Sequence, residues 1–225
     1  MNQFLWVIFP YFMVTIFIGG HIYSYNFKQM EWTAKSSEFF EKNQLKWGSM
    51  LFHIGILLVF LGHVAGLLIP KTFLDNIGIT EEIYHAGAVY GGGFAGLLTL
   101  AGIIILLGRR HSNKRIRLTS DISDMITIWL IFFIIIVGLY NTLIGNRLHP
   151  GFDYRETISP WVRGLLTFTP DPERMREVPF RFQLHLLLSF LLIGIWPFTR
   201  LVHVWSAPLN YFKRSPVLYR RNKEF

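Results

Sequence analysis

The chain has 225 residues, of which 52% are hydrophobic and only 16% are charged. A soluble domain carries about 25% charged residues, so this composition excludes a soluble protein and indicates one built into a membrane. The net charge of +8 does not indicate a nucleic-acid partner, because the cations lie in short loops and a tail beside apolar runs.

The chain contains no cysteine. This excludes disulfides, Cys-ligated iron–sulfur clusters and covalently attached haem. A redox cofactor would have to be held by histidine or methionine, and its electrons would have to leave for another polypeptide.

Five runs are apolar and about 20 residues long, which is enough to cross a hydrocarbon core of about 30 Å. We therefore predict an all-α membrane protein, a single integral membrane domain over residues 1–225 with five transmembrane helices. The expected spans are 4–23, 48–69, 84–107, 122–144 and 180–204, followed by a tail over 205–225.

Fifteen of the 22 lysines and arginines fall on one side of the membrane when these spans alternate in direction. They lie in the 24–47 and 108–121 loops and at the C-terminal end. Because cytoplasmic loops carry the excess of positive charge, we expect the N-terminus outside and the C-terminus in the cytoplasm.

Four histidines lie within the second and fifth expected spans: His53, His63, His185 and His203. An imidazole in hydrocarbon is costly unless it is satisfied, so such residues are functional candidates. The two spans are antiparallel, and only the pairing of His53 with His203 and of His63 with His185 matches their depths. Four histidines in two pairs are the ligand count of two bis-histidine haems, which we expect between the second and fifth helices.

The two spans separate their histidines unequally. At 1.5 Å per residue, the 10 residues from His53 to His63 cover about 15 Å, whereas the 18 residues from His185 to His203 cover about 27 Å. We expect helix tilt or a bend at Pro197 to absorb the difference.

Other roles for these histidines fit less well. A zinc ion would need ligands that converge on one point. A proton relay would favour accompanying carboxylates, which the second and fifth spans lack. A membrane anchor or transporter with packing histidines is the remaining alternative, and an optical spectrum for b-type haem would decide it.

Three further residues are candidates for binding a cofactor or substrate. His85 opens the third span and is either an interfacial packing residue or the proton acceptor of a quinol site. Gly66, three residues after His63, serves close helix packing or leaves room for a haem macrocycle. Arg200, three residues before His203, is either a positive-inside anchor or the partner of a haem propionate.

Two segments outside the spans carry predictions of their own. The loop before the fifth span contains ISPWVRGLLTF, whose apolar residues and Arg163 predict a short interfacial helix on the outer side. The C-terminal tail mixes aromatic residues with cations. We interpret it either as a docking segment for a cytoplasmic partner or as an anchor to anionic membrane lipid.

The histidine-bearing motifs resemble those of a known family. They are LFHIG and GHVAG in the second span, R-x-x-LH at the start of the fifth and WPFTRLVHVWSAP at its end. This pattern is similar to that of the gamma subunits of respiratory nitrate reductases, and the resemblance covers essentially the whole chain. Some relatives have a lysine near the start of the third span, where this chain reads EEIYHAG.

The resemblance implies a dihaem cytochrome b that binds two haems b. His63 and His185 would ligate a distal haem near the outer face, and His53 and His203 a proximal haem near the cytoplasmic face. Menaquinol or ubiquinol would be oxidised near the distal haem. The electrons would pass to a cytoplasmic iron–sulfur beta subunit and a molybdenum-containing alpha subunit, which reduces nitrate to nitrite. This chain would hold no nitrate site, and similar cytochromes of sulfite-reductase and heterodisulfide-reductase-type complexes are the alternative.

Overall fold

The computed structural model describes residues 2–28, 37–145 and 152–205, and this part of the chain is helical apart from short connections. Five helical rods are long and apolar enough to cross a membrane, which confirms the predicted number of spans. The rods are Phe4–Phe27, Asn43–Leu68, Glu81–Ser112, Ile122–Gly145 and Phe180–Phe198. Apart from Trp205, the predicted tail lies outside the described residues.

Several rods contain more than one kind of helix. The first rod joins the π-helical η1 (Phe4–Ile8) to α1 (Phe9–Phe27), and the second is α2 (Asn43–Leu68). The third joins α4 (Glu81–Ala86), the π-helical η2 (Gly87–Gly91) and α5 (Gly92–Ser112), and the fourth joins α7 (Ile122–Leu139) to the π-helical η3 (Tyr140–Gly145). The fifth joins α10 (Phe180–Ile195) to the 3-10 turn η5 (Trp196–Phe198). Short elements complete the fold: α3 (Lys71–Asn76), α6 (Lys114–Leu118), α9 (Ile158–Leu166), η4 (Pro172–Arg176) and η6 (Arg200–Val204).

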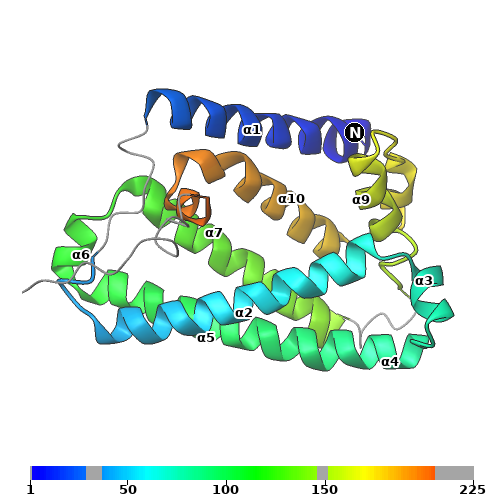
Figure 1. The fold of residues 1–225 in the computed structure, drawn as a ribbon, viewed down its shortest axis with the longest axis horizontal. Coiled ribbons are helices and arrows are strands. Elements are labelled where there is room, and N and C mark those ends of the chain that lie inside the picture. Colours follow the sequence, from blue (N-terminus) through cyan, green and yellow to red (C-terminus); the bar gives the residue numbers. More distant parts are fainter. Residues whose placement is uncertain (1, 29–36, 146–151, 206–225) are drawn as a thin grey trace, which may run out of the picture.

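The rods form a bundle in which each packs on one or two neighbours (Figure 1). Helix α2 lies along α5, α5 also packs on α7, α7 packs on α10, and α10 packs on α1. By contrast, α2 and α10 scarcely touch each other. Helices α3 and α9 lie at the end of the bundle where the chain begins, which we call the α9 end, and α6 lies at the other end, which we call the α6 end.

Helices α2 and α5 approach closely because glycines face the contact. A Cβ atom added to Gly55 would lie 2.6 Å from the backbone nitrogen of Thr99, and one added to Gly102 would overlap the backbone nitrogen of Phe52. Thr99 is fully buried, and its hydroxyl donates a hydrogen bond to the carbonyl of Ala95 at 2.7 Å. Small residues at such crossings allow backbones to pack directly. The close contact with α5 therefore fixes the position of α2.

The fifth rod differs from the prediction of one helix up to residue 204. Helix α10 ends at Ile195, since Pro197 has no N–H to continue the helical hydrogen bonds. Thr199 is extended (φ −126°, ψ 171°), and the chain then forms the separate turn η6. In Figure 1 this orange-red segment curls up beside the end of α10 instead of prolonging it.

Helix α1 is shaped to accept this break. A Cβ atom on Gly20 would lie 2.8 Å from the ring of Pro197, and the hydroxyl of Ser24 donates to the Pro197 carbonyl at 3.5 Å. The predicted bend at Pro197 is therefore a complete helix end, held in place by α1.

The short helix predicted before the fifth span is present as α9, and three buried residues attach it to the bundle: Ile158, Ser159 and Trp161. Trp161 is fully buried, and its indole N–H donates to the carbonyl of Trp6 at 2.9 Å. Ser159 and Arg163 donate to the carbonyls of Gly66 and Leu67 at 2.9 and 3.1 Å. Because the last carbonyls of a helix lack partners within it, α9 serves as the cap of α2.

Candidate functional site

The structure brings the four span histidines together in two pairs. The ring centres of His63 and His185 are 6.1 Å apart, and the two rings are nearly parallel, at 22°. The ring centres of His53 and His203 are 5.9 Å apart, and these rings are steeply inclined, at 76°. In each pair one ring comes from α2 and the other from the fifth rod or the turn after it.

Hydrogen bonds fix the ring orientation and the tautomer of three of the four histidines. The Nδ1 atoms of His53, His63 and His203 lie 2.7–2.8 Å from the carbonyls of Ser49, Val59 and Arg200. A carbonyl oxygen can only accept, so each Nδ1 carries the proton. The Nε2 atom is then left with its lone pair, which is the form in which a histidine ligates a metal.

His185 is held by packing. The Nδ1 atom of His185 is buried, and it forms no hydrogen bond of standard distance and angle with the described residues. Its ring lies against Gly138 of α7, where an added Cβ atom would be 3.0 Å from the ring carbon Cε1. Because residue 138 is a glycine, it leaves the space that the imidazole of His185 occupies.

The separation within each pair fits two axial ligands of one metal ion. A histidine nitrogen lies about 2 Å from a metal that it binds, and about 1 Å from its own ring centre, so two opposed ligands place their ring centres about 6 Å apart. Both pairs meet this spacing. Within the described ranges, no three His, Cys, Asp or Glu side chains converge as a zinc site would require. His53 and His63 are exposed rather than covered by other side chains, so a flat cofactor between α2 and α10 would contact them directly.

The α6 end contains two buried arginines, although both belong to the basic segment that the sequence assigned to a loop. Arg109, only 3% exposed, donates to the carboxylate and carbonyl of Glu41 and to Ser37. Arg110 donates to Asp124 at 3.1 Å and to Ser120 at 2.9 Å. These cations therefore fix contacts between helices.

The room left by Gly66 is filled by protein. A Cβ atom at Gly66 would lie 2.7 Å from the Tyr84 hydroxyl and 2.8 Å from the Tyr154 hydroxyl, and these two hydroxyls are hydrogen bonded at 2.6 Å. This differs from the prediction of room for a macrocycle, because two tyrosines from elsewhere in the chain converge on that position. Burial and the hydrogen bond shared with Tyr84 raise the pKa of Tyr154 far above its ordinary value, so its hydroxyl stays protonated.

A charged network surrounds this tyrosine pair at the α9 end. The guanidinium of Arg155 lies 4.3 Å from the ring centre of Tyr84 and donates from Nε and Nη2 to the carboxylate of Asp153. Glu81 lies 3.7 Å from Arg155 and 3.3 Å from Lys71. Burial raises the pKa of Asp153, but the hydrogen bonds from Arg155 outweigh it and hold this pKa below its ordinary value. The carboxylate of Asp153 therefore remains charged at neutral pH.

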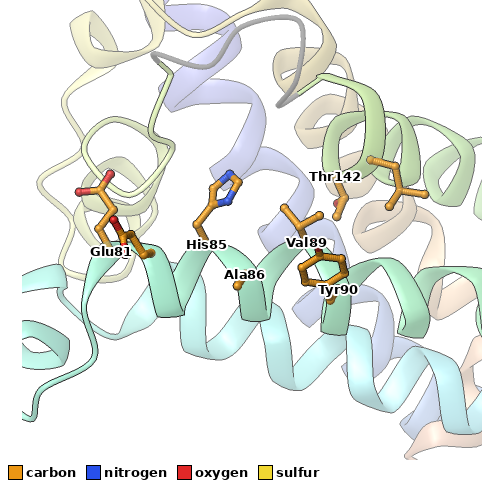
Figure 2. Close-up of a pocket in the computed structure, with 8 residues that line it drawn as sticks. Glu81, His85, Ala86, Val89, Tyr90 and Thr142 are labelled. Atoms are coloured by element: carbon orange, nitrogen blue, oxygen red, sulfur yellow. The ribbon is translucent and has the colours of Figure 1, made fainter.

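His85 lines a pocket of ≈ 520 Å³ beside this network. Its walls come from α4, η2 and η3: Glu81, Glu82, His85, Ala86, Val89, Tyr90, Thr142 and Leu143. Figure 2 shows His85 and Val89 on the same side of their rod, the side on which Thr142 lies. Thr142 donates to the carbonyl of Gly138 at 3.0 Å, so the pocket begins one helical turn from the place of the His185 ring.

Arg200 lies at the α6 end, where its guanidinium is 3.6 Å from the carboxylate of Asp124 and its carbonyl accepts from His203. Sequence reasoning missed Asp124, Gly138 and the Tyr84–Tyr154 pair. Asp124 alone carries a local signal, as an acidic residue that begins an otherwise apolar run. The others function through contacts between distant parts of the chain.

The sequence is similar to those of several known proteins. Residues 2–222 match the family described as nitrate reductase gamma subunit. The chain is 48% identical over 220 residues to the nitrate reductase gamma chain of Bacillus subtilis, covering 98% of each protein. It is 35% identical to the respiratory nitrate reductase 2 gamma chain of Escherichia coli, covering 99% of this chain and 98% of that one. It is also 36% identical to a nitrate reductase-like protein of Mycobacterium tuberculosis, of which it covers 34%.

Proposed function

The chain belongs to the nitrate reductase gamma subunit family, and on that premise we propose that it is the dihaem cytochrome b that oxidises quinol for a respiratory nitrate reductase. It is a membrane subunit of a multi-subunit nitrate reductase and a multi-pass protein of the cytoplasmic membrane. The observation that carries the proposal is the pair of opposed imidazoles at each end of the bundle.

In this proposal His63 and His185 hold one haem b, and His53 and His203 hold the other. A haem bound at either pair would be held by both of its histidines and would supply one-electron transfer there. The carbonyl partners of Nδ1 on His53, His63 and His203 orient the rings and raise the basicity of the ligating nitrogen. The two haem sites lie toward opposite ends of the bundle, which supports transfer across the membrane.

The quinol, menaquinol or ubiquinol, binds in the pocket of His85. Its apolar wall and the exposed ring of Tyr90, 79% accessible, suit a substrate that arrives from the lipid. Oxidation releases two electrons and two protons. His85 accepts a proton from the quinol hydroxyl within the pocket, and Glu81 at its rim connects it with the charged network at the α9 end. The electrons leave singly through the His63–His185 site.

The direction of transfer follows from the orientation. The α9 end faces outside with the N-terminus, and the α6 end, with its concentrated cations, faces the cytoplasm. With haems held at both pairs, electrons taken up at the His63–His185 site would pass to the His53–His203 site and on to an iron–sulfur beta subunit. A molybdenum-containing alpha subunit then reduces nitrate. Protons released outside while electrons move inward make the reaction electrogenic.

A reduced-minus-oxidised spectrum of the purified protein tests the proposal. We expect b-type bands and two haems per chain. Substituting His63 or His185 by alanine should remove one and the same haem, and substituting His53 or His203 should remove the other.

His111→Ala is the matched control. His111 forms the same kind of Nδ1–carbonyl contact, at 2.9 Å to Leu107, but its ring faces Trp129 and no second histidine. This variant should keep both haems. A protein without b-type bands, or variants of one pair that lose different haems, would contradict the proposal.

A further inference from the structure

One carboxylate at the α6 end joins three separate elements. Asp124, in the first turn of α7, lies 3.1 Å from Arg110 of α5 and 3.6 Å from Arg200 of η6. The side chains of all three are largely buried, with exposed fractions of 18%, 9% and 29%. A negative charge is also favourable in the first turn of a helix. The position of Asp124 is therefore firmly fixed, and its charge is shared between two guanidiniums.

Arg200 is joined to His203 through its backbone. The carbonyl of Arg200 accepts the hydrogen bond from Nδ1 of His203 at 2.7 Å. The same residue thus presents its side chain to Asp124 and its carbonyl to the imidazole. The contact with Asp124 therefore restrains the same residue whose carbonyl orients the ring.

The turn that carries His203 needs such an anchor. It is a five-residue 3-10 segment that begins after the extended residue Thr199 and does not continue α10. Short 3-10 segments have weaker hydrogen-bond geometry than an α-helix. Thr199 caps the Leu201 N–H at 3.3 Å, the side chain of Val202 is buried, and Trp205 packs edge-on against Phe17 and His21 of α1. The Asp124 contact adds an ion pair between this turn and α7.

We propose that Asp124 positions the ring of His203 by acting through Arg200. The negative charge of Asp124 also sets the reduction potential of the haem at the His53–His203 site. The inference rests on the proposed function, because it requires His203 to be an axial ligand. Its effect is confined to one site, since the His63–His185 pair lies toward the other end of the bundle and is oriented by Val59 and Gly138.

The test is Asp124→Asn in the complete nitrate reductase complex. The amide keeps the size of the side chain but removes the negative charge that offsets Arg110 and Arg200. The reduced haem, which carries one more electron, becomes favoured. A unit charge about 10 Å away at an effective dielectric constant of about 20 changes this equilibrium constant roughly tenfold. That fold-change corresponds to an upward shift of about 59 mV for a one-electron couple.

Two readouts separate positioning from a general loss of structure. A redox titration should show the shift for the haem at the His53–His203 site, and its low-spin paramagnetic resonance signal should change as the ring moves. The haem at the His63–His185 site, measured in the same sample, should keep its potential and signal. Ser120→Ala is the matched control, because it removes the other hydrogen bond to Arg110 without touching Arg200, and it should leave both haems unchanged.

The outcomes distinguish the inference from the function on which it rests. If the wild-type complex lacks two b haems, the proposed function fails. If it has them and Asp124→Asn leaves the His53–His203 site unchanged, or shifts both sites equally, the inference alone fails. If the Asp124→Asn complex does not assemble, Arg200→Gln is the substitute test. This variant is expected to lower the reduction potential of the haem at the His53–His203 site alone, and an unchanged potential overturns the inference.

Discussion

The ring of His185 depends on the absence of a side chain at Gly138, so Gly138→Ala is a direct perturbation of one haem site. The added Cβ atom would lie 3.0 Å from Cε1 of the ring. Two carbon atoms in contact prefer about 3.5–4.0 Å, so the imidazole must retreat by about 0.5–1 Å. Overpacking of this kind costs about 1–3 kcal/mol, which corresponds to roughly tenfold to hundredfold weaker retention of the haem at this site.

The assay is the haem content per chain and its loss on heating, followed by optical redox titration. We expect the His63–His185 site of the variant to lose its haem first and at a lower temperature, while the His53–His203 site behaves as in the wild type. Quinol-driven nitrate reduction should fall in parallel, because electrons enter at the affected site.

Gly92→Ala on the third rod is the control. Its added Cβ atom would meet only a methyl carbon of Thr142 at 3.8 Å, which is an ordinary contact. Both variants gain the same helix propensity, so a difference between them reports the clash. A Gly138→Ala protein that retains both haems with the stability and potentials of the Gly92→Ala protein would refute the reasoning.

Three further predictions follow from the geometry. Perpendicular axial rings leave the iron orbitals more nearly equal in energy than parallel rings do. The low-spin resonance signal at the higher g value should therefore belong to the His53–His203 site, and His203→Ala should abolish it while leaving the other signal. Burial raises the pKa of Glu41, but hydrogen bonds from backbone amides and Arg109 outweigh it and hold this pKa below the ordinary 4.5. The stabilisation is then complete above pH 4.5 and is lost as the pH falls through the folded-state pKa; accordingly, the wild-type melting temperature should exceed that of Glu41→Gln at neutral pH and converge with it in acid. Finally, His85→Ala should slow haem reduction by quinol roughly hundredfold in stopped-flow measurements, with the dithionite-reduced spectrum unchanged; an unaffected rate would remove His85 from the quinol site.

Properties that are local along the chain were predictable from the sequence. The five spans follow from the length of the apolar runs, and the structure has five rods at the same places with slightly different ends. The juxtaposition of His53 with His203 and of His63 with His185 follows from depth on two antiparallel spans. Both features follow from hydropathy and from the alternating direction of the spans, whatever the packing of the helices.

Other features were decided only by the tertiary structure. The unequal spacing of the histidines is resolved by the end of α10 at Ile195, which places His203 on a turn supported by α1 and by Asp124. In the sequence, Gly138 and Gly66 do not differ from other small residues of a membrane helix. The structure shows that the ring of His185 packs on Gly138 and that two tyrosine hydroxyls pack on Gly66. The hydrophobic pattern specifies which segments are inserted as helices. The orientation of an imidazole depends instead on contacts between residues far apart in the chain, which a pattern of hydropathy does not encode.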